Sequence, residues 1–479
     1  MRKNYRSYIL VLSILGIAVI CRPSFGADWY VNPGAAPGGD GTSWSQAFQS
    51  IQQAVNAATP IWTICQGPPD TIHVRDGIYR RTTPIEINRY VNILGGYNFK
   101  GVRNWKNYPS IIDGQGVTRC LKITRPCILD GFTIRNGNAD GDMGGGGIHI
   151  DSAPIYCSTD DFYHVPKIKN CSITDNSAAA PFSSGGGICD IESNTEIENC
   201  VFERNVATAG GAINHAYSSI TIDKCLFHDN HAVLGGFCGG GAIHGFSRND
   251  TTGGLIYITN SLFYENTSVS RGGAICNNQV DPQIWNCTFY NNAAGEGLLG
   301  GAYYGYTGSD GPYIYNSIFW ENTPDQLYID HPRYYIGHSD IQGGWTGSGG
   351  DNIDEDPLFV SPATGDFHLS FGSPCIDSGR FFGSALPDDL DGLLRPFDGN
   401  GDGTAQWDMG AYEFTRITLP GDLNWDWDLD GRDLGGFGIS FGSHQGDSAY
   451  NAGCDFNADG AINENDLGVF ADTFGELDL

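Results

Sequence analysis

The stretch Gly272–Asn292, GGAICNNQVDPQIWNCTFYNN, contains the two short motifs around which the chain is organised. One motif is Gly-Gly-Ala-Ile and the other is Phe-x-x-Asn, and both recur with small variations between residues 144 and 322. The Gly-Gly motif occurs at Gly145–Ile148, Gly185–Ile188, Gly210–Ile213, Gly240–Ile243, Gly272–Ile275 and, as GGAY, Gly300–Tyr303. The second motif occurs at Ile173–Asn176, Phe202–Asn205, Phe227–Asn230, Phe263–Asn266, Phe289–Asn292 and Phe319–Asn322. Recurrence every ~25 to 40 residues is typical of repeat proteins.

Each repeat holds two brief strand-like runs separated by Gly, Asn and Ser, and it is too short to bury a core alone. Stacked repeats give every strand a parallel neighbour about 4.8 Å away. The sequence therefore predicts an all-β fold, a parallel β-helix. The motifs resemble the repeat of polymorphic outer-membrane proteins, within the right-handed β-helix group that includes the pectate lyases. This resemblance implies a right-handed parallel β-helix solenoid and says much less about chemistry.

Residues 1–26 have the pattern of a secretory signal peptide. Basic residues precede the apolar run Tyr8–Ile20, and the small residues Ser24 and Gly26 follow it at the spacing of a cleavage site. The apolar run is shorter than the ~20 residues that a membrane-spanning helix needs. We therefore expect cleavage after Gly26, an extracellular protein that is secreted or attached to the cell surface, and no transmembrane segment in the mature chain.

The charge balance excludes one class of partner. The chain has 55 Asp and Glu residues against 26 Lys and Arg residues, a formal net charge of −29. Nucleic-acid binding needs clustered Lys and Arg side chains, so we expect no nucleic-acid partner. An acidic exported protein more plausibly binds calcium, although solubility alone accounts for part of the charge.

The pattern divides the chain into a β-helix over residues 27–416 and a separate module over residues 417–479. Between Trp44 and Ala58, apolar residues fall at helical spacing, which predicts a short amphipathic helix. Such a helix over the first coil would cover an open sheet edge at the N-terminal end of the solenoid. Short β-rich runs from Asp70 to Ile134 read as early, less regular coils.

Two rows of side chains inside the repeats read as structural. Strict alternation in Asn-Cys-x-Phe directs Cys and Phe to the same side, the core, and predicts a buried row of Cys171, Cys200, Cys225, Ser261, Cys287 and Ser317. Disulfides between neighbouring coils are one interpretation, and buried thiols that act as small apolar groups are the stronger one. The Asn that ends each Phe-x-x-Asn motif predicts a hydrogen-bonded ladder along the solenoid axis.

The position after each Phe points outward and is the candidate ligand contact. It carries Glu203 and then, on successive coils, His228, Tyr264, Tyr290 and Trp320. A strip of rings about 4.8 Å apart could stack against sugar rings. Cross-strand aromatic pairs also stabilise sheets by roughly 0.2–1 kcal/mol each, which is the structural alternative.

A third row at the turn carries Asp175, Asp229, Glu265 and Glu321, interrupted by Arg204 and Asn291. These carboxylates could bind calcium or act as general acid and base, or they could be a solvated turn. The signatures of β-helix hydrolases appear only as fragments, Asp160-Asp161 and His244-Gly245. Catalytic residues therefore stay unknown. After the coils, alternating oxygen ligands from Asp398 to Asp408 indicate either a further calcium site or a plain turn.

The C-terminal module contains a duplicated pattern of calcium ligands. Hard cations prefer oxygen ligands, and a Gly at position 6 of the loop permits the sharp turn. The second loop supplies Asp455, Asn457, Asp459, Asn463 and Asp466, with Gly460 at position 6. Thirty-three residues earlier the first loop supplies Asp422, Asn424, Asp426, Asp430 and Asp433, with Trp427 where Gly should stand. Each loop leads into an expected helix.

Two duplicated loop–helix units with Asp at position 12 closely resemble a type I dockerin, a small α-helical module of EF-hand-like calcium loops. The resemblance implies Ca²⁺ as cofactor and a cohesin-like protein as partner of the module. The first loop departs from the pattern at Trp427, because a non-Gly residue resists a left-handed backbone. Gly431-Arg432 and Glu464-Asn465 stand where known dockerins often have Ser-Thr at the cohesin contact, which leaves the partner class open.

Two functions from different classes follow from these patterns. The first is a secreted or surface-attached β-helix that binds carbohydrate or surface ligands and is docked through its calcium module. The second is a polysaccharide lyase or glycoside hydrolase acting in the degradation of extracellular polysaccharides. Dockerins usually carry carbohydrate-active enzymes, which favours the second, whereas the coils lack a complete catalytic signature, which favours the first.

Overall fold

The computed structural model describes residues 26–59, 68–139, 144–151, 155–157, 162–217, 219–234, 238–247, 254–306, 311–381, 386–400, 403–415, 423, 431–457 and 459–473. Apart from Gly26, the expected signal peptide lies outside these ranges. So do Asp160-Asp161 and, in the first predicted calcium loop, Asp422, Asn424, Asp426, Trp427 and Asp430. Among the described residues, no helix has the length and apolar character needed to cross a membrane.

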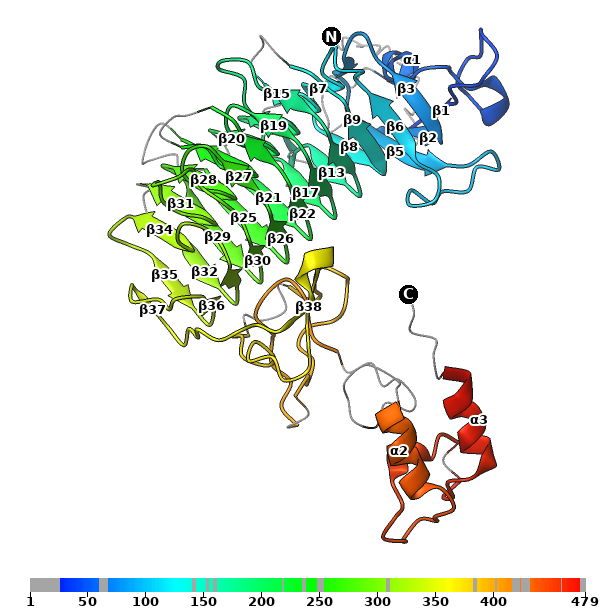
Figure 1. Cartoon of the computed structure of the whole chain (residues 1–479). Coiled ribbons are helices and arrows are strands. Elements are labelled where there is room, and N and C mark those ends of the chain that lie inside the picture. Colours follow the sequence, from blue (N-terminus) through cyan, green and yellow to red (C-terminus); the bar gives the residue numbers. More distant parts are fainter. Residues whose placement is uncertain are drawn as a thin grey trace, which may run out of the picture.

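Parallel strands stack coil upon coil into long sheets, as Figure 1 shows along the length of the solenoid. Sheet A runs in the order β1 (Asp28–Val31), β2 (Asp70–Arg75), β5 (Val91–Tyr97), β8 (Cys127–Asp130), β13 (Lys167–Lys169), β17 (Glu196–Glu198), β21 (Ile220–Asp223), β25 (Leu255–Thr259), β29 (Asp281–Trp285), β32 (Tyr313–Tyr315), β35 (Tyr335–Gly337), β37 (Gly349–Gly350). Sheet B runs in the order β3 (Gly77–Arg80), β6 (Ser110–Asp113), β9 (Phe132–Arg135), β14 (Ser172–Thr174), β18 (Val201–Glu203), β22 (Leu226–His228), β26 (Leu262–Tyr264), β30 (Thr288–Tyr290), β33 (Ile318–Trp320), β36 (Asp340–Ile341).

Two further parallel sheets complete the coils. Sheet C runs in the order β4 (Ile85–Ile87), β7 (Leu121–Ile123), β10 (Ile148–Asp151), β16 (Ile188–Ile191), β20 (Ile213–Ala216), β24 (Ile243–Phe246), β28 (Ile275–Asn278), β31 (Tyr303–Tyr306), β34 (Leu327–Asp330). Sheet D is short and comprises β15 (Ser177–Ala178), β19 (Val206–Ala207), β23 (His231–Ala232), β27 (Thr267–Ser268). A hairpin of β11 (Ile155–Cys157) and β12 (Phe162–His164) projects from one coil. The stacking confirms the predicted parallel β-helix.

The repeats place one left-handed residue at each of two corners, which bends the chain sharply between sheets. The corner between sheets A and B has φ between 46° and 53° at Asn170, Asn199, Lys224, Asn260, Asn286 and Asn316. The corner between sheets B and D has φ between 50° and 57° at Asp175, Arg204, Asp229, Glu265, Asn291 and Glu321. Asn and Asp tolerate this conformation better than most side chains. The row that runs from Asp175 to Glu321 therefore forms the turn between sheets B and D, whether or not its carboxylates have a further role.

The interior is built from ladders of like residues in register. Phe202, Phe227 and Phe263 pair across β18, β22 and β26, and Phe289 and Phe319 continue the row on β30 and β33. Successive rings lie 4.5 to 4.8 Å apart and within 7° of parallel. All five Phe side chains are fully buried. The alternation in each motif thus directs Phe to the core as expected.

The Asn that ends each motif forms a continuous hydrogen-bonded ladder, which confirms its structural interpretation. Each side-chain amide donates to the side-chain oxygen of the next coil at 2.9 to 3.0 Å, from Asn176 through Asn205, Asn230, Asn266 and Asn292 to Asn322. Each amide also donates to the carbonyl of the motif's Phe or Ile one coil back, as Asn230 does to Phe202. The ladder satisfies buried polar groups that would otherwise lack partners.

The predicted row of Cys171, Cys200, Cys225 and Cys287 is buried, and all four thiols are free, as expected. Ser261 and Ser317 occupy the same row. The Cys225 thiol and the Ser261 hydroxyl both donate to the carbonyl two residues earlier, at 3.3 and 2.7 Å. A disulfide joins Cys238 to Cys276 elsewhere in the fold. Cys and Ser therefore serve the same local purpose at this corner.

The N-terminal end is covered as predicted, with a shorter helix. The predicted segment Trp44–Ala58 divides into a 3₁₀ turn, η1 (Trp44–Gln46), and a helix, α1 (Ile51–Ala57). Ser50 forms a capping box with Gln53, which starts the helix later than apolar spacing alone suggests. Ile51, Ala54 and Val55 are buried within the same core cluster as the first coils.

The coils end earlier than the predicted boundary of 416. Sheets A and B end at β37 and β36, and the chain from Asp356 to Phe414 contains the antiparallel pair β38 (Phe359–Ser361) and β39 (Asp366–Leu369) with the 3₁₀ turn η3 (Pro362–Thr364) between them. We call residues 356–414 the C-terminal segment. The predicted range 27–416 thus includes a segment that packs on the solenoid, because its apolar residues contact the outer face of sheet B.

Beyond residue 430 the structure describes two helices of equal length, α2 (Gly431–Ser440) and α3 (Glu464–Thr473), and a 3₁₀ turn, η4 (Ala452–Cys454), drawn in orange and red in Figure 1. The ring centroids of Phe437 and Phe470 lie 5.1 Å apart. These two residues form a small core with Cys454 and Ile462. Each helix and its Phe recur with an offset of 33 residues, so the duplication in the sequence is also present in the fold.

Candidate functional site

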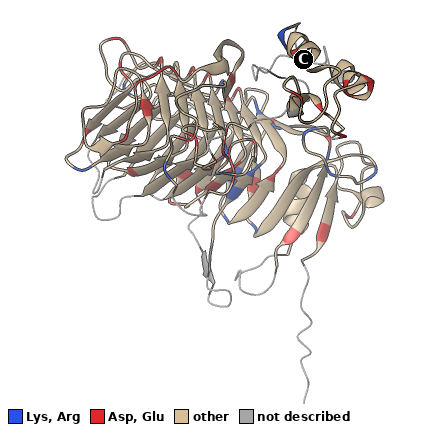
Figure 2. Ribbon diagram, turned by 90° about the horizontal axis from the view of Figure 1, so that it is seen from below, with Lys and Arg blue, Asp and Glu red and all other residues tan. Residues whose placement is uncertain are grey.

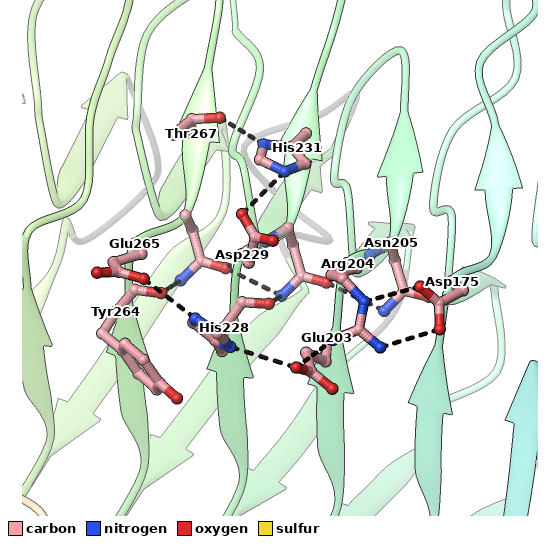
Figure 3. A network of polar contacts seen from close by, with 12 residues as sticks. Asp175, Glu203, Arg204, Asn205, His228, Asp229, His231, Tyr264, Glu265 and Thr267 are labelled. Carbon is pink, nitrogen blue, oxygen red and sulfur yellow. Dashed lines mark hydrogen bonds and ion pairs between the residues drawn. The ribbon is translucent and has the colours of Figure 1, made fainter. Parts of the chain in front are cut away.

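The outer face of sheet B carries a histidine between two carboxylates, which Figure 3 shows from close by. His228 lies in register with Glu203 on β18 and with Tyr264 on β26. Its Nε2 lies 3.1 Å from Oε2 of Glu265, and its Nδ1 lies 3.5 Å from Oε1 of Glu203. The Tyr264 ring stacks on the imidazole with centroids 4.1 Å apart. We call these four residues, with Arg204, the His228 cluster.

The left-handed corner brings the charged residues of the cluster together. Arg204 occupies that corner and donates two hydrogen bonds to Asp175 one coil back, at 2.8 and 3.0 Å. Arg204 also forms an ion pair with Glu203. On sheet D, a second histidine has a similar arrangement (Figure 3). Nε2 of His231 lies 3.0 Å from Oδ1 of Asp229, and its Nδ1 lies 2.7 Å from the Thr267 hydroxyl. Side chains from four successive coils thus converge on one half-exposed surface.

The structure gives the predicted strip of rings an unexpected neighbour. Tyr264 and Tyr290 each contact Phe367 with centroids 5.1 Å apart, and Tyr290 also contacts Phe359 at 6.0 Å. Trp320 packs beside the same segment. The rings of Tyr264, Tyr290 and Trp320 are therefore half-buried beneath the C-terminal segment. Their role as ligand contacts stays a prediction, and His228 lies at the end of the strip nearer the N-terminus.

Polar contacts fix the C-terminal segment to the coils. Asn316 accepts from the Arg380 N–H and donates to the Arg380 carbonyl, at 2.8 and 2.9 Å. The Ala411 N–H donates to the Thr288 hydroxyl at 3.0 Å. These bonds join positions far apart in the sequence. The segment is therefore held to the solenoid by hydrogen bonds as well as by its apolar contacts with sheet B.

The interior of the C-terminal segment is a buried charge network. Arg395 and Glu413 form a fully buried ion pair at 2.7 Å. Asp408, proposed above as a calcium ligand, accepts instead from the N–H groups of Asp377 and Phe414 and is fully buried. Burial raises the pKa of Asp408, with the charge of Glu413 adding to the shift. Backbone groups thus occupy the carboxylate, which favours the turn over the calcium interpretation.

The same segment forms one wall beside the His228 cluster. Lys224 and Asp388 form an ion pair at 2.5 Å. His368 lies 2.6 Å from Asp366 and 2.8 Å from Asp391, and its pKa is raised to about 9, first by the hydrogen bond with Asp391. That bond and the charge of Lys106 hold the pKa of Asp391 below its usual value.

Trp105 and Lys106 form the opposite wall. A pocket of about 410 Å³ lies between them and the floor of sheet B, and it is lined by Trp105, Lys106, Pro109, Gly131, Phe132, Thr133, Asn170, Cys171, Ser172, Asn199 and Val201. Gly96 and Gly131 allow the close approach of Trp105, because a side chain at either position would meet Trp105 atoms within 2.9 Å. Arg103 anchors the loop through an ion pair with Asp130 at 2.6 Å.

The second predicted calcium loop is held by its own ligand residues. Both oxygens of the buried Asp466 accept backbone N–H groups, from Phe456 and Asn463, at 2.8 and 2.9 Å. Asp455 accepts from the N–H groups of Asp459 and Gly460 at 3.1 and 2.9 Å. Gly460 has φ of +82°, the left-handed conformation for which Gly was expected. The carboxylate and amide oxygens of this loop match the chemistry that Ca²⁺ prefers.

The described part of the first loop repeats one of these contacts. The Leu423 N–H donates to Oδ1 of the buried Asp433 at 2.7 Å, as Phe456 does to Asp466 thirty-three residues later. The other predicted ligands of the first loop lie outside the described residues. Within the described ranges, no three His, Cys, Asp or Glu side chains converge closely enough to form a metal cluster. Calcium binding by either loop stays a prediction.

The acidic residues are spread over the β-helix and the C-terminal helices, with basic residues interspersed, as Figure 2 shows. Two cations of this region follow the same pattern, since Arg204 of the His228 cluster and Lys224 are both paired with carboxylates. Sequence reasoning placed Glu203, His228 and Glu265 in two separate rows. It missed their convergence because the left-handed corner rotates Glu265 toward the preceding coil. In each Phe-x-x-Asn motif the outward strand residue is followed directly by the corner residue, and this spacing was the signal that could have predicted the convergence.

Comparison with known proteins gives a match to part of the solenoid. A family described as "Right handed beta helix region" matches residues 130–331. Among solved structures, the chain is similar to pectate lyase Pel9A, with 14% identity and a TM-score of 0.47, over 82% of this chain and 97% of that one. It is also similar to a rhamnogalacturonan lyase, with 14% identity and a TM-score of 0.32, over 70% of this chain and 91% of that one. A pectin methylesterase from Aspergillus niger has 12% identity and a TM-score of 0.25, over 68% and 85%. A search of curated proteins gives no match.

Proposed function

Starting from a right-handed β-helix with one partly covered face, we propose that this chain binds a carbohydrate chain along the outer face of sheet B. The site would run from Trp105 over Val201 to His228. The observation that carries the proposal is the pocket of about 410 Å³ beside Trp105, which lies on the same face as the His228 cluster. Ligand sites are concave, with apolar walls and a few convergent polar groups, and this face has both.

The chemistry of the walls and floor suits a polyhydroxylated ligand. Trp105 offers an aromatic wall, and the hydroxyls of Thr133 and Ser172 and the amides of Asn170 and Asn199 line the floor. Amide and hydroxyl groups both donate and accept hydrogen bonds. In this proposal His228 contacts the ligand, while the half-buried Tyr264, Tyr290 and Trp320 support the C-terminal segment. The C-terminal segment then limits how far a ligand extends along the solenoid.

A catalytic role, as a polysaccharide lyase or glycoside hydrolase, is the second candidate. It is favoured by the contacts of His228 with both Glu203 and Glu265. An imidazole between two carboxylates can accept a proton on one nitrogen and donate from the other, which is the requirement for general acid–base catalysis. Arg204 lies beside this group and could neutralise a negative charge on the substrate. In this version Glu203, His228 and Glu265 are the candidate catalytic residues.

We further propose that residues 417–479 form a dockerin-like docking module that depends on Ca²⁺ and binds a cohesin-like protein. The support is the 33-residue duplication of helix, core Phe and loop contact, together with a left-handed Gly460. Asp455, Asn457, Asp459, Asn463 and Asp466 would hold the ion in the second loop. When bound, the ion would neutralise carboxylates that repel one another. Attachment through this module fits an extracellular protein.

The direct test is incubation of the purified protein with a panel of neutral and acidic polysaccharides, with and without Ca²⁺. Retention without products would support a binding function. New reducing ends would support a hydrolase, and an unsaturated product detected by ultraviolet absorbance would support a lyase. Absence of both retention and products across the panel would contradict the proposal.

If products appear, two variants separate catalysis from binding. Glu265→Gln and His228→Asn should each lower kcat by about 100-fold or more while changing KM little, because a lost acid or base acts on the chemical step. Glu321→Gln is the matched control, since Glu321 occupies the same corner row two coils away. Equal loss of activity in all three variants would contradict a catalytic role for the His228 cluster.

A further inference from the structure

Sheet A carries a group of aromatic side chains on its outer face that belongs to neither site above. Core residues Ile256, Ile258, Ile284, Ile314 and Ile336 alternate with them along β25, β29, β32 and β35 and are fully buried. The intervening side chains therefore point away from the core. They are Tyr257, Thr259, Gln283, Trp285, Tyr313, Tyr315 and Tyr335, and we call this set the sheet A platform.

The register places the rings of the platform on adjacent coils. Tyr313 pairs with Tyr335 across β32 and β35, and Trp285 pairs with Tyr315 across β29 and β32. The centroids of Tyr315 and Tyr335 lie 5.3 Å apart, and those of Trp285 and Tyr315 lie 6.4 Å apart. Tyr257 is 40% exposed, and the other four rings are half-buried. Trp285, Tyr315 and Tyr335 are thus in ring contact over three coils, and Gln283 lies in register between Tyr257 and Tyr313.

The platform contrasts in charge with the earlier part of the same face. There Lys167 pairs with Glu196 at 2.5 Å, and Lys169 pairs with Glu198. From Tyr257 to Tyr335, the outward positions of the described strands carry aromatic, hydroxyl or amide groups. Asp281, at the start of β29, is buried and accepts the Gly311 N–H at 3.1 Å.

The sheet A platform is an uncharged surface of aromatic and hydroxyl groups, although the protein has a formal net charge of −29. Cross-strand pairing of rings stabilises a sheet. Such pairing does not explain why Tyr257 is exposed, or why four of the five rings are Tyr and not Phe. Tyr and Trp combine an apolar ring face with a polar edge, which is the complement of a sugar ring with its apolar face and equatorial hydroxyls. Charge complementarity therefore favours a neutral ligand over an anionic one.

From this arrangement we infer that the sheet A platform is a second binding site, and that its ligand is a neutral polysaccharide chain lying along the solenoid axis. Tyr257, Tyr313 and Tyr335 stack against sugar rings, while Gln283 and Thr259 hydrogen-bond to hydroxyl groups between them. The site lies on a different sheet from the pocket beside Trp105. It therefore stands or fails separately from the function proposed above.

The test compares the full chain with two matched variants. The triple variant Tyr257→Ala, Tyr313→Ala, Tyr335→Ala removes the stacking faces, and the triple Tyr→Phe variant keeps the rings. Affinity electrophoresis and calorimetry with neutral polysaccharides, such as xylan, β-glucan and galactan, should show at least tenfold weaker binding for the alanine variant. The phenylalanine variant should lose about threefold or less. Binding should also persist in about 0.5 M salt, because it does not depend on charge.

Further variants keep the outcome decisive. If the alanine variant does not fold, Gln283→Lys replaces it, since it leaves every ring in place and adds a charge to the middle of the platform, and it should weaken binding to the same degree. Asp330→Asn, at an exposed position of β34 on sheet C, is the control and should bind as the parent does.

Each alternative result overturns the inference. Unchanged binding by the alanine variant would make the platform structural. Binding abolished by Trp105→Ala and unaffected by the tyrosine variants would leave the sheet B proposal intact and remove this one. Concentration-dependent self-association that the alanine variant abolishes, without loss of carbohydrate binding, would identify the platform as a contact between copies. No retention on any neutral polysaccharide would also contradict it.

Discussion

The Cys375 thiol donates a hydrogen bond to Oδ2 of Asp340 at 3.3 Å, and both side chains are fully buried. Cys375 belongs to the C-terminal segment and Asp340 to β36, so this contact joins the segment to the end of sheet B. Burial raises the pKa of Asp340 to about 7. Glu413, in the interior of the segment, has its pKa raised to about 7 by the same cause.

These raised pKa values predict a pH-dependent attachment of the C-terminal segment. The folded protein binds the Asp340 proton more tightly than the unfolded chain does, because the pKa is about 7 in the fold against a usual value of 3.8. The protonated side chain therefore contributes its full stabilisation below about pH 3.8, and this contribution is lost as the pH rises through about 7. Unfolding by denaturant at several pH values should show stability falling between about pH 4 and about pH 7. Asp340→Asn should flatten this slope. Asp330→Asn, at an exposed position, should retain it, and an equal slope in all three proteins would contradict the role of Asp340.

The Asn ladder predicts a large cost for one amide. Asn230→Ala would leave the backbone N–H of Asn205 and one N–H of its side-chain amide without an acceptor, because both donate to Oδ1 of Asn230. Unsatisfied buried donors cost ~1–3 kcal/mol each, so we expect the free energy of unfolding to fall by about 3 kcal/mol. Chemical denaturation measures this value. The exposed Thr221→Ala should change it by less than about 0.5 kcal/mol, and a similar small change for Asn230→Ala would refute the ladder's importance.

The buried row of Cys and Ser side chains, which includes Cys225 and Ser261, predicts that serine can replace cysteine. Cys225→Ser should cost less than about 1 kcal/mol, because a hydroxyl can donate to the Asp223 carbonyl as the thiol does and can accept the Cys200 N–H as Ser261 accepts that of Cys225. Cys225→Leu should cost more, since the row has no room for added volume. Thermal unfolding compares the two.

Burial also raises the pKa of Cys287 to about 12, so thiol alkylation should require unfolding.

Calcium binding by the C-terminal module is best tested in the full chain by calorimetric titration after chelation. We expect one tighter site in the second loop, lost in Asp455→Ala, and a weaker site in the first loop, tightened in Trp427→Gly because Gly permits the left-handed turn. Glu464→Gln, exposed and outside the predicted ligand set, is the control. Helical content by circular dichroism should rise on calcium addition, because binding free energy becomes folding free energy. Absence of heat and of any spectral change would remove the cofactor.

The repeats predicted the coils because each motif specifies a local choice that stacking then multiplies. Phe and Asn occupy their predicted rows because alternation along a strand fixes the direction of each side chain. The C-terminal segment was not predicted as a cover, because its contacts, such as Thr288 with Ala411, join residues far apart in the sequence. The strip of Tyr264, Tyr290 and Trp320 was correctly directed outward. Its partial burial depends on that distant segment, so the sequence pattern alone could not reveal it.

The convergence at His228 was out of reach for a similar reason. Glu203 and Glu265 flank the imidazole only because the left-handed corner turns one of them back along the axis. The pocket beside Trp105 depends on Gly96 and Gly131, whose lack of side chains reads in the sequence as ordinary turns. The calcium loops stay a prediction, one that spacing alone could make because all the expected ligands of each loop lie within one short stretch.

The central claim, that the outer face of sheet B beside Trp105 binds carbohydrate, is tested most directly by calorimetry with the polysaccharide that the panel selects. Trp105→Ala removes the aromatic wall of the pocket, and Thr221→Ala serves as the control on sheet A. The account predicts at least tenfold weaker binding for Trp105→Ala and unchanged binding for Thr221→Ala. Unchanged affinity in Trp105→Ala, with the fold intact by circular dichroism, would contradict it.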